Sequence, residues 1–207
     1  MFQRSWFWDR LANRYARMPI ADQAAYATKL EKIRAHLRPD SRLLEFGCGT
    51  GSTAILLAPQ VALIQAIDYS PQMLEIAREK ARAAGVSKLQ FAQATLAELD
   101  SPAGSWDVIL GMNILHLLPD RTPTIVRAHQ LLKPGGVFIS GTFCIGDGSW
   151  QMRVLAPVLR ALPLLPSVSS LTLGQLKSEM EGAGFAIEEC WLPGANKAAF
   201  IVARKQA

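Results

Sequence analysis

The chain has 207 residues, half of them hydrophobic and 19% charged, and its formal net charge is +5 at pH 7. This length supports one globular domain with an unaided hydrophobic core, and the composition excludes a disordered chain. The three cysteines and three histidines stand at spacings that indicate neither a disulfide framework nor a metal site, so we expect no metal and a reducing, cytoplasmic compartment.

Membrane-spanning and leader segments are not expected. The best apolar stretch, residues 154–166, is shorter than the roughly 20 residues that a spanning helix needs, and an arginine and prolines interrupt it. The N-terminus lacks the continuous apolar run of a signal peptide. Its basic and aromatic residues are instead compatible with a helix that touches an anionic membrane surface.

The predicted elements alternate between helices and short apolar strands. Residues 1–38 are expected to form two helices, as an N-terminal lid segment. Residues 39–207 are expected to form one α/β domain on a parallel sheet, whose strands are apolar on both faces. The first five predicted strands cover 43–46, 63–67, 89–91, 106–110 and 137–143.

Helix boundaries are marked by capping residues. Ser70 and Pro71 predict the start of a helix that Gly85 ends. Thr172 and Gln175 match a capping box and predict a second helix start.

The end of the chain and one internal stretch depart from the alternating pattern. The runs 185–192 and 197–204 flank a Pro-Gly-Ala-Asn turn, which predicts a hairpin and therefore an antiparallel pair at the sheet edge. Residues 144–171 hold many leucines and prolines without a clean period, so we expect a helical cap inserted there.

A glycine-rich loop follows the first predicted strand. Gly47, Gly49 and Gly51 alternate there, and glycines between a strand and a helix let the backbone approach a ligand closely. Asp68 ends the next strand, where a carboxylate can accept both hydroxyls of a ribose. The third glycine comes one residue too early for a dinucleotide-binding loop, and Glu45 suits a cofactor with a positive ammonium group. The loop therefore predicts S-adenosylmethionine.

Four segments resemble, in chain order, the motifs of class I S-adenosylmethionine-dependent methyltransferases. They are LLEFGCGTG (43–51), AIDYS (66–70), WDVILGMNILHLLPD (106–120) and LLKPGGVFIS (131–140). Residues 7–20 are similar to the start of the small-molecule branch that includes quinone-ring methyltransferases. The resemblance implies a Rossmann-like, seven-stranded, mostly parallel sheet of order 3-2-1-4-5-7-6, with the last strand antiparallel and helices on both faces.

The resemblance also implies a set of cofactor-binding residues. The loop glycines line the methionine part, Glu45 holds its amino group and Asp68 binds the ribose. Tyr69 and Met73 flank the adenine, and Asn113 lies near the sulfonium. Many relatives have an acid where this chain has Thr95, so that hydroxyl or a backbone group takes over the adenine contact. The full set is Tyr15, Glu45, Gly47, Cys48, Gly49, Gly51, Asp68, Tyr69, Met73, Thr95, Leu96 and Asn113.

The expected reaction is methyl transfer to a small molecule, which leaves S-adenosyl-L-homocysteine. His116 is the candidate general base, required only if the acceptor loses a proton in the reaction, and its alternative is a histidine that packs in the loop. Asp147 is a candidate contact for an amine acceptor, or an exposed turn residue. The aromatic N-terminus and the leucine-rich stretch 154–173 either pack as a lid or roof a pocket for a quinone, phenol, amine or lipid precursor.

Three other functions compete with this one. An NAD-dependent oxidoreductase would need a different glycine spacing. A nucleic-acid methyltransferase often carries an Asn/Asp-Pro-Pro-aromatic loop where this chain has residues 111–114, and the scattered basic residues do not indicate nucleic-acid binding. A cofactor-binding but non-catalytic partner subunit with the same fold stays open, as do the acceptor and the oligomeric state.

Overall fold

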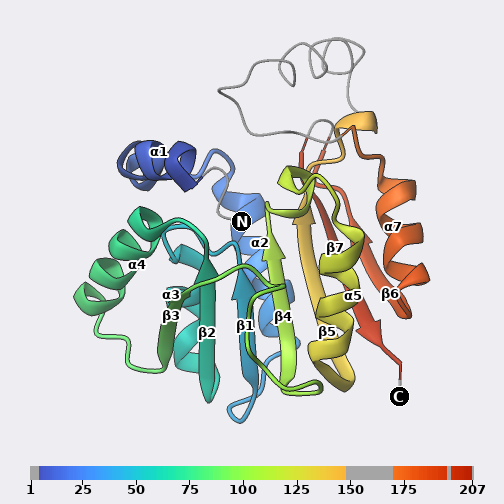
Figure 1. Cartoon of the computed structure of the whole chain (residues 1–207). Coiled ribbons are helices and arrows are strands. Elements are labelled where there is room, and N and C mark those ends of the chain that lie inside the picture. The colour runs from blue at the N-terminus through green and yellow to red at the C-terminus, as the bar shows by residue number, and fades with distance from the viewer. Residues whose placement is uncertain (1–4, 148–169, 195–196, 207) are drawn as a thin grey trace.

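The computed structural model describes residues 5–147, 170–194 and 197–206. Figure 1 shows a central twisted sheet flanked by helices, with the first helix lying over one edge. Most of the expected cap insertion at 144–171, and two residues of the hairpin turn, lie outside the described residues.

The strands form one seven-stranded sheet in the order β3-β2-β1-β4-β5-β7-β6, which confirms the expected topology. β1 to β5 pair in parallel, whereas β7 runs antiparallel to both β5 and β6. The strands are β1 (Arg42–Phe46), β2 (Leu63–Asp68), β3 (Leu89–Gln93), β4 (Trp106–Met112), β5 (Leu132–Thr142), β6 (Phe185–Trp191) and β7 (Ala199–Lys205).

The helices begin where their capping residues predict. Ser70 accepts a hydrogen bond from the Met73 N–H at 3.2 Å, and Thr172 and Gln175 form the complete capping box. The described α-helices are α1 (Ser5–Arg17), α2 (Gln23–Arg34), α3 (Ser52–Leu57), α4 (Pro71–Ala83), α5 (Thr122–Leu131) and α7 (Leu173–Gly182). No described helix is long and apolar enough to cross a membrane.

Two hydrophobic cores form because the central strands are apolar on both faces. One core lies under α5 and α7 and includes the fully buried rings of Trp106 and Phe138. The other lies under α2, α3 and α4 and includes Ile33, Leu57 and Leu74. The sheet is therefore held between two layers of helices, with its carboxyl edge free to carry a site.

β5 differs from the expectation by starting at Leu132 rather than at residue 137. Trp106 pairs with Leu132 and Val108 already pairs with Val137, so the Pro-Gly-Gly segment bulges out within the strand instead of preceding it. Gly135 has a φ of 74°, which lets the backbone make this bulge without steric strain.

Helix α1 is tied to the start of α4. The Asp9 carboxylate accepts hydrogen bonds from the Ser70 hydroxyl at 2.6 Å and from the Gln72 N–H at 3.3 Å. Ala12 on the same helix is fully buried. Because α4 begins at the carboxyl edge of the sheet, these contacts hold α1 over that edge (Figure 1).

Candidate functional site

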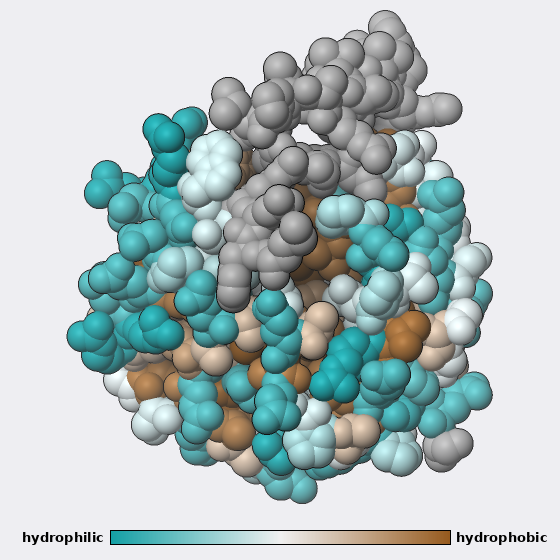
Figure 2. Space-filling model, in the orientation of Figure 1, coloured by the Kyte–Doolittle hydropathy of each residue, from teal (hydrophilic) through white to brown (hydrophobic). Residues whose placement is uncertain are grey.

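The candidate site lies at the carboxyl edge of the sheet, where the strand order reverses between β1 and β4. Such a reversal leaves a crevice because the connections on its two sides run to opposite faces. The glycine loop follows β1, Asp68 ends β2 and Asn113 follows β4, so the topology gathers the expected residues at one place. Figure 2 shows hydrophobic residues in a hollow over this edge.

The three loop glycines have different surroundings. A Cβ on Gly47 would stand 2.8 Å from the Ile114 side chain, and one on Gly51 would stand 3.0 Å from both Ala77 and Phe91. These two glycines are therefore required by close packing. A Cβ on Gly49 would meet only the Tyr15 ring, at 3.8 Å, so Gly49 is the glycine whose backbone faces open space.

Asp68 joins the second strand to the glycine loop. One carboxylate oxygen accepts the Gly49 N–H at 2.8 Å and the other accepts the Ser70 N–H at 2.9 Å. Burial raises the pKa of Asp68, although these two N–H groups act to lower it. Each oxygen has a second lone pair, so the hydrogen bonds orient the carboxylate and leave it able to accept hydroxyl groups.

Glu45 is buried, with 2% of its surface exposed. Its pKa is raised to about 8 by burial and, to a smaller degree, by the negative charge of Asp68, while a hydrogen bond from the Ala54 N–H opposes the rise. Its Oε2 atom has no hydrogen-bond partner among the described residues. A buried polar atom without a partner costs stability, and at a ligand site it marks a position that a ligand group fills. An ammonium group matches that need.

Tyr15 of α1 lies over the glycine loop. Burial raises its pKa, and the carboxyls of Asp68 and Glu45 raise it further, because a phenolate there would meet like charge. The phenol therefore remains protonated and can donate a hydrogen bond. The N-terminal segment brings a polar group to the site as well as a covering surface.

The residues expected around the adenine differ in accessibility. Met73 and Leu96 are 2% and 3% exposed, so they form an apolar floor. The Thr95 hydroxyl donates to Glu98 at 2.8 Å and the Glu98 N–H bonds back to it. Thr95 is thus used in a local turn, and a contact to an adenine amino group would fall to its remaining lone pair or to the backbone. The Tyr69 carbonyl accepts a hydrogen bond from Gln93, which sequence patterns did not indicate.

After β4, Asn113 adopts a positive φ of 56° and donates its N–H to the Gly141 carbonyl at 2.7 Å. It is the one described residue other than glycine with such a backbone. Strained backbone of this kind concentrates at functional sites. Three residues further along, the His116 ring packs edge-on against Phe143 with centroids 5.3 Å apart. Burial lowers the pKa of His116 to about 4, so its ring is neutral at pH 7.

Asp147 and Cys48, two further residues that the sequence analysis considered, have structural roles. Asp147 accepts the Leu173 N–H at 2.5 Å and ties the end of β5 to the start of α7. Cys48 is buried, and burial raises the pKa of its thiol well above the usual value, so it is unreactive.

Lys80 of α4 is a neighbour of the site that sequence reasoning missed. Its ammonium donates to the Ser52 hydroxyl at 2.6 Å and to the Thr50 hydroxyl at 3.4 Å. Burial lowers its pKa. No sequence signal links Lys80 on α4 to Ser52, which lies 28 positions earlier at the start of α3. This hydrogen bond is therefore visible only in the structure.

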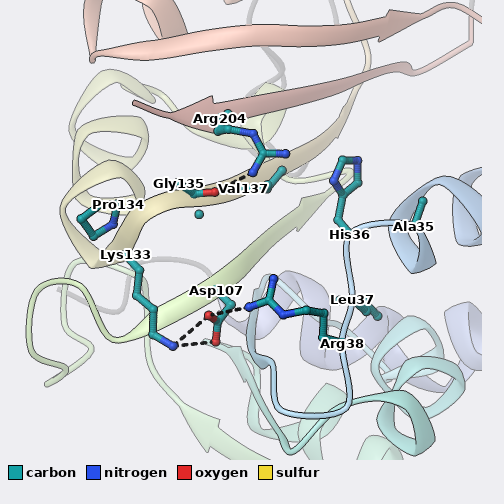
Figure 3. Close-up of a pocket in the computed structure, with 11 residues that line it drawn as sticks. Ala35, His36, Leu37, Arg38, Asp107, Lys133, Pro134, Gly135, Val137 and Arg204 are labelled. Carbon is teal, nitrogen blue, oxygen red and sulfur yellow. Dashed lines mark hydrogen bonds and ion pairs between the residues drawn. The ribbon is translucent and has the colours of Figure 1, made fainter. Parts of the chain in front are cut away.

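A separate cavity of about 340 Å³ lies at the opposite, amino edge of the sheet (Figure 3). Its cations are already paired: Lys133 bonds both oxygens of Asp107 at 2.8 and 2.9 Å, and Arg204 bonds Glu188 and the Gly135 carbonyl. The cavity therefore offers little unpaired charge to a ligand, and the predicted site residues lie at the other edge.

Comparison with known proteins agrees with this geometry. Residues 43–136 match the family model described as a methyltransferase domain. A 27-O-demethylrifamycin SV methyltransferase from Amycolatopsis mediterranei is 36% identical over 111 residues, which cover 53% of this chain and 41% of that protein. A ubiquinone biosynthesis O-methyltransferase from Xanthomonas axonopodis is 32% identical over 141 residues, which cover 65% and 58%. The chain thus spans about half the length of the curated relatives it matches.

Solved structures confirm the fold. The [4+2]-cyclase SpnF superposes with a TM-score of 0.80 at 20% identity, covering 100% of this chain and 97% of that one. The sheet order, the glycine loop after β1 and the matched segment lead to one conclusion: residues 43–136 are similar to a methyltransferase domain, and they lie within a seven-stranded, Rossmann-like fold.

Proposed function

We propose that this protein transfers the methyl group of S-adenosylmethionine to a hydroxyl of a small aromatic or quinone-like acceptor. The observation that carries the proposal is the buried Glu45 carboxyl, whose Oε2 has no partner among the described residues, beside Asp68 and the open backbone of Gly49. A carboxylate for an ammonium group, a carboxylate for a ribose and a bare glycine between them together fit this cofactor.

Each residue would act on one part of the cofactor. Glu45 would hold the amino group, Asp68 the ribose hydroxyls and Gly49 would admit the methionine chain. Tyr15 of α1 would donate a hydrogen bond to the cofactor, and Met73 and Leu96 would form an apolar surface beneath the adenine. When bound, S-adenosylmethionine supplies a methyl group on a sulfonium, a carbon already activated for displacement.

The chain's own contribution to the reaction is alignment and exclusion of water. Asn113, fixed by its hydrogen bond to Gly141, would lie on the acceptor side. His116 is neutral at pH 7 and so is in the form that accepts a proton from an acceptor hydroxyl. Phe143, 38% exposed and packed on His116, offers an aromatic surface for a flat ring.

The acceptor class rests on the relatives as well as on this surface. Two curated relatives are named as a 27-O-demethylrifamycin SV methyltransferase and a ubiquinone biosynthesis O-methyltransferase, and both names specify an oxygen as the methylated atom. An acceptor hydroxyl has a proton to lose, which gives the neutral His116 a role. An amine acceptor would be the next class to test.

Calorimetric titration tests the cofactor assignment. We expect saturable binding of S-adenosylmethionine and S-adenosyl-L-homocysteine, and none of NAD. Asp68→Ala should abolish the binding of S-adenosylmethionine and its product. Asp100→Ala, which removes an exposed carboxylate outside the site, should leave this binding unchanged. Binding of NAD alone would overturn the proposal in favour of an oxidoreductase.

Binding alone does not show turnover, because SpnF has the same fold and is a cyclase. A methyltransferase is distinguished from a protein that only binds the cofactor by transfer of labelled methyl from S-adenosylmethionine to a panel of catechols, hydroquinones and aromatic amines. Label in the phenolic products supports the proposal. Cofactor binding without transfer to any acceptor favours the non-catalytic partner subunit.

A further inference from the structure

The carboxyl edge of the sheet carries exposed apolar side chains as well as the cofactor site. Met18 and Ile20, which follow α1, are 58% and 46% exposed, and Trp6 on α1 is 44% exposed. Phe143 after β5 and Leu192 after β6 are also exposed at this edge, since both strands end there. Large apolar residues gathered on one side of a protein indicate an interaction surface.

Helix α1 adds a row of cations beside these residues. Trp6, Arg10, Arg14 and Arg17 recur at spacings of three and four, so they share one face of the helix, and all are exposed. Ala12 points the opposite way and is fully buried. None of the three arginines forms a hydrogen bond or ion pair with another described residue of the chain, and the one acid of α1, Asp9, is bonded to Ser70.

The geometry points to an anionic lipid bilayer as the partner of this docking face, which consists of Trp6, Arg10, Arg14, Arg17, Met18 and Ile20. Arginines gain from anionic head groups, and tryptophan favours the interface between head groups and acyl chains. Exposed Met18 and Ile20 gain from entry into the acyl boundary. A nucleic acid would attract the arginines through its phosphates, but these aliphatic side chains would not contribute to binding it. Figure 2 shows hydrophilic and pale side chains side by side over α1.

The docking face has a use that rests on the proposed function. A quinone-like acceptor partitions into the bilayer, and Tyr15 places α1 directly over the glycine loop. Contact between α1 and the bilayer would set the acceptor side of the site against the phase that holds the acceptor.

Sedimentation with lipid vesicles tests this inference without cofactor or turnover, so its failure is separate from failure of the proposed function. The probes are vesicles of phosphatidylcholine alone and of equal parts phosphatidylcholine and phosphatidylglycerol. The test variant is Arg10→Gln/Arg14→Gln/Arg17→Gln. The matched control, Arg34→Gln/Arg82→Gln/Lys88→Gln, removes the same charge from exposed positions at the amino edge.

We expect binding to the anionic vesicles only, weakened about a hundredfold in the test variant and unchanged in the control. Met18→Ser/Ile20→Ser should weaken it by about tenfold through the apolar part of the contact. Absence of binding, or equal binding by the test variant and the unaltered protein, would overturn the inference. Tighter binding to polyuridylate than to the anionic vesicles would assign the face to nucleic acid instead.

Discussion

At the scale of single residues, burial favours the uncharged forms of Glu45 and His116. The Glu45 carboxyl, with its pKa raised to about 8, is protonated at pH 7, and the His116 ring, with its pKa lowered to about 4, is neutral. Desolvation disfavours the charged form of either group. Both groups are therefore uncharged at pH 7 before ligands arrive, and two pH predictions follow from this.

Cofactor binding should release a proton from Glu45. Because the ligand's ammonium group pairs with the carboxylate, affinity should rise with pH, at most tenfold per unit, and level off above about pH 8. Titration in buffers of different ionisation enthalpy measures the released proton. Glu45→Gln should bind more weakly and lose this pH dependence. An affinity independent of pH between 6 and 8 in the unaltered protein would contradict the assignment.

The His116 prediction concerns the rate. A base with a lowered pKa is ready at every pH above that value and is lost only as the pH falls through it, so kcat should stay flat from about pH 8 down to about pH 5. His116→Gln should lower kcat by about a hundredfold while the dissociation constant of S-adenosylmethionine stays unchanged. A kcat that falls below pH 6.5 would contradict the lowered pKa of His116, and an effect of the variant on cofactor binding alone would speak against a base.

At the scale of elements, the glycine loop is shaped by what packs behind it. Gly51 has a φ of 72° and lies against α4 and β3, so that a Cβ added there would stand 3.0 Å from Ala77 and from Phe91. Lys80 holds the same loop through the Ser52 hydroxyl. The loop therefore contacts α4 and β3 and leads into α3. Its conformation depends on this packing as much as on its own glycines.

Gly51→Ala should destabilise the protein by about 3 kcal/mol, from the left-handed backbone and the overpacked methyl together. Gly85→Ala is the matched control, because Gly85 has a φ of 65° but nothing within 4 Å of its Cβ position. Gly85→Ala should lower the free energy of unfolding only by the cost of the left-handed backbone, about 1 kcal/mol. Urea unfolding measures both. Equal losses in the two variants would show that the packing behind the loop is unimportant.

At the scale of the whole molecule, the two edges of the sheet have different duties. The carboxyl edge carries the candidate site, while ion pairs surround Asp107 at the amino edge (Figure 3). Asp107 accepts from the Arg42 N–H at 2.9 Å and from Lys133, so it joins β1, β4 and β5. Partial burial acts to raise the pKa of Asp107, but Lys133, the Arg42 N–H and Arg38 outweigh it and hold the pKa below its usual value.

Asp107→Asn should cost about 2 kcal/mol at neutral pH. The ionised carboxylate contributes its full stabilisation above the pKa of about 3.9 in the unfolded chain, and this contribution is lost as the pH falls through the lowered folded-state value. Chemical unfolding at pH 7 and in acid should thus show a gap between the two proteins that narrows with acid. Asp40→Asn breaks only an exposed pair with Arg38 and should change stability little.

The sequence alone predicted the alternation of strands and helices and a candidate site after the first two strands, and the resemblance of its motifs implied the sheet order. Alternating apolar runs, the caps at Ser70 and Thr172 and the glycines before a strand-end Asp68 are local signals, and local backbone preferences are read directly from neighbouring residues. Parallel pairing then brings the carboxyl ends of β1, β2 and β4 together. For this reason the gathering of Glu45, Gly49 and Asp68 could be expected from the chain itself, whereas the sheet order was implied by the resemblance.

The tertiary structure decided which of those residues are free to bind and what charge they carry. Burial and contacts between distant segments produce the raised pKa of Glu45, the turn at Thr95, the Asp9–Ser70 bond that places α1, and the difference between Gly49 and its two packed neighbours. Such properties depend on the surroundings in three dimensions, which no spacing along the chain encodes.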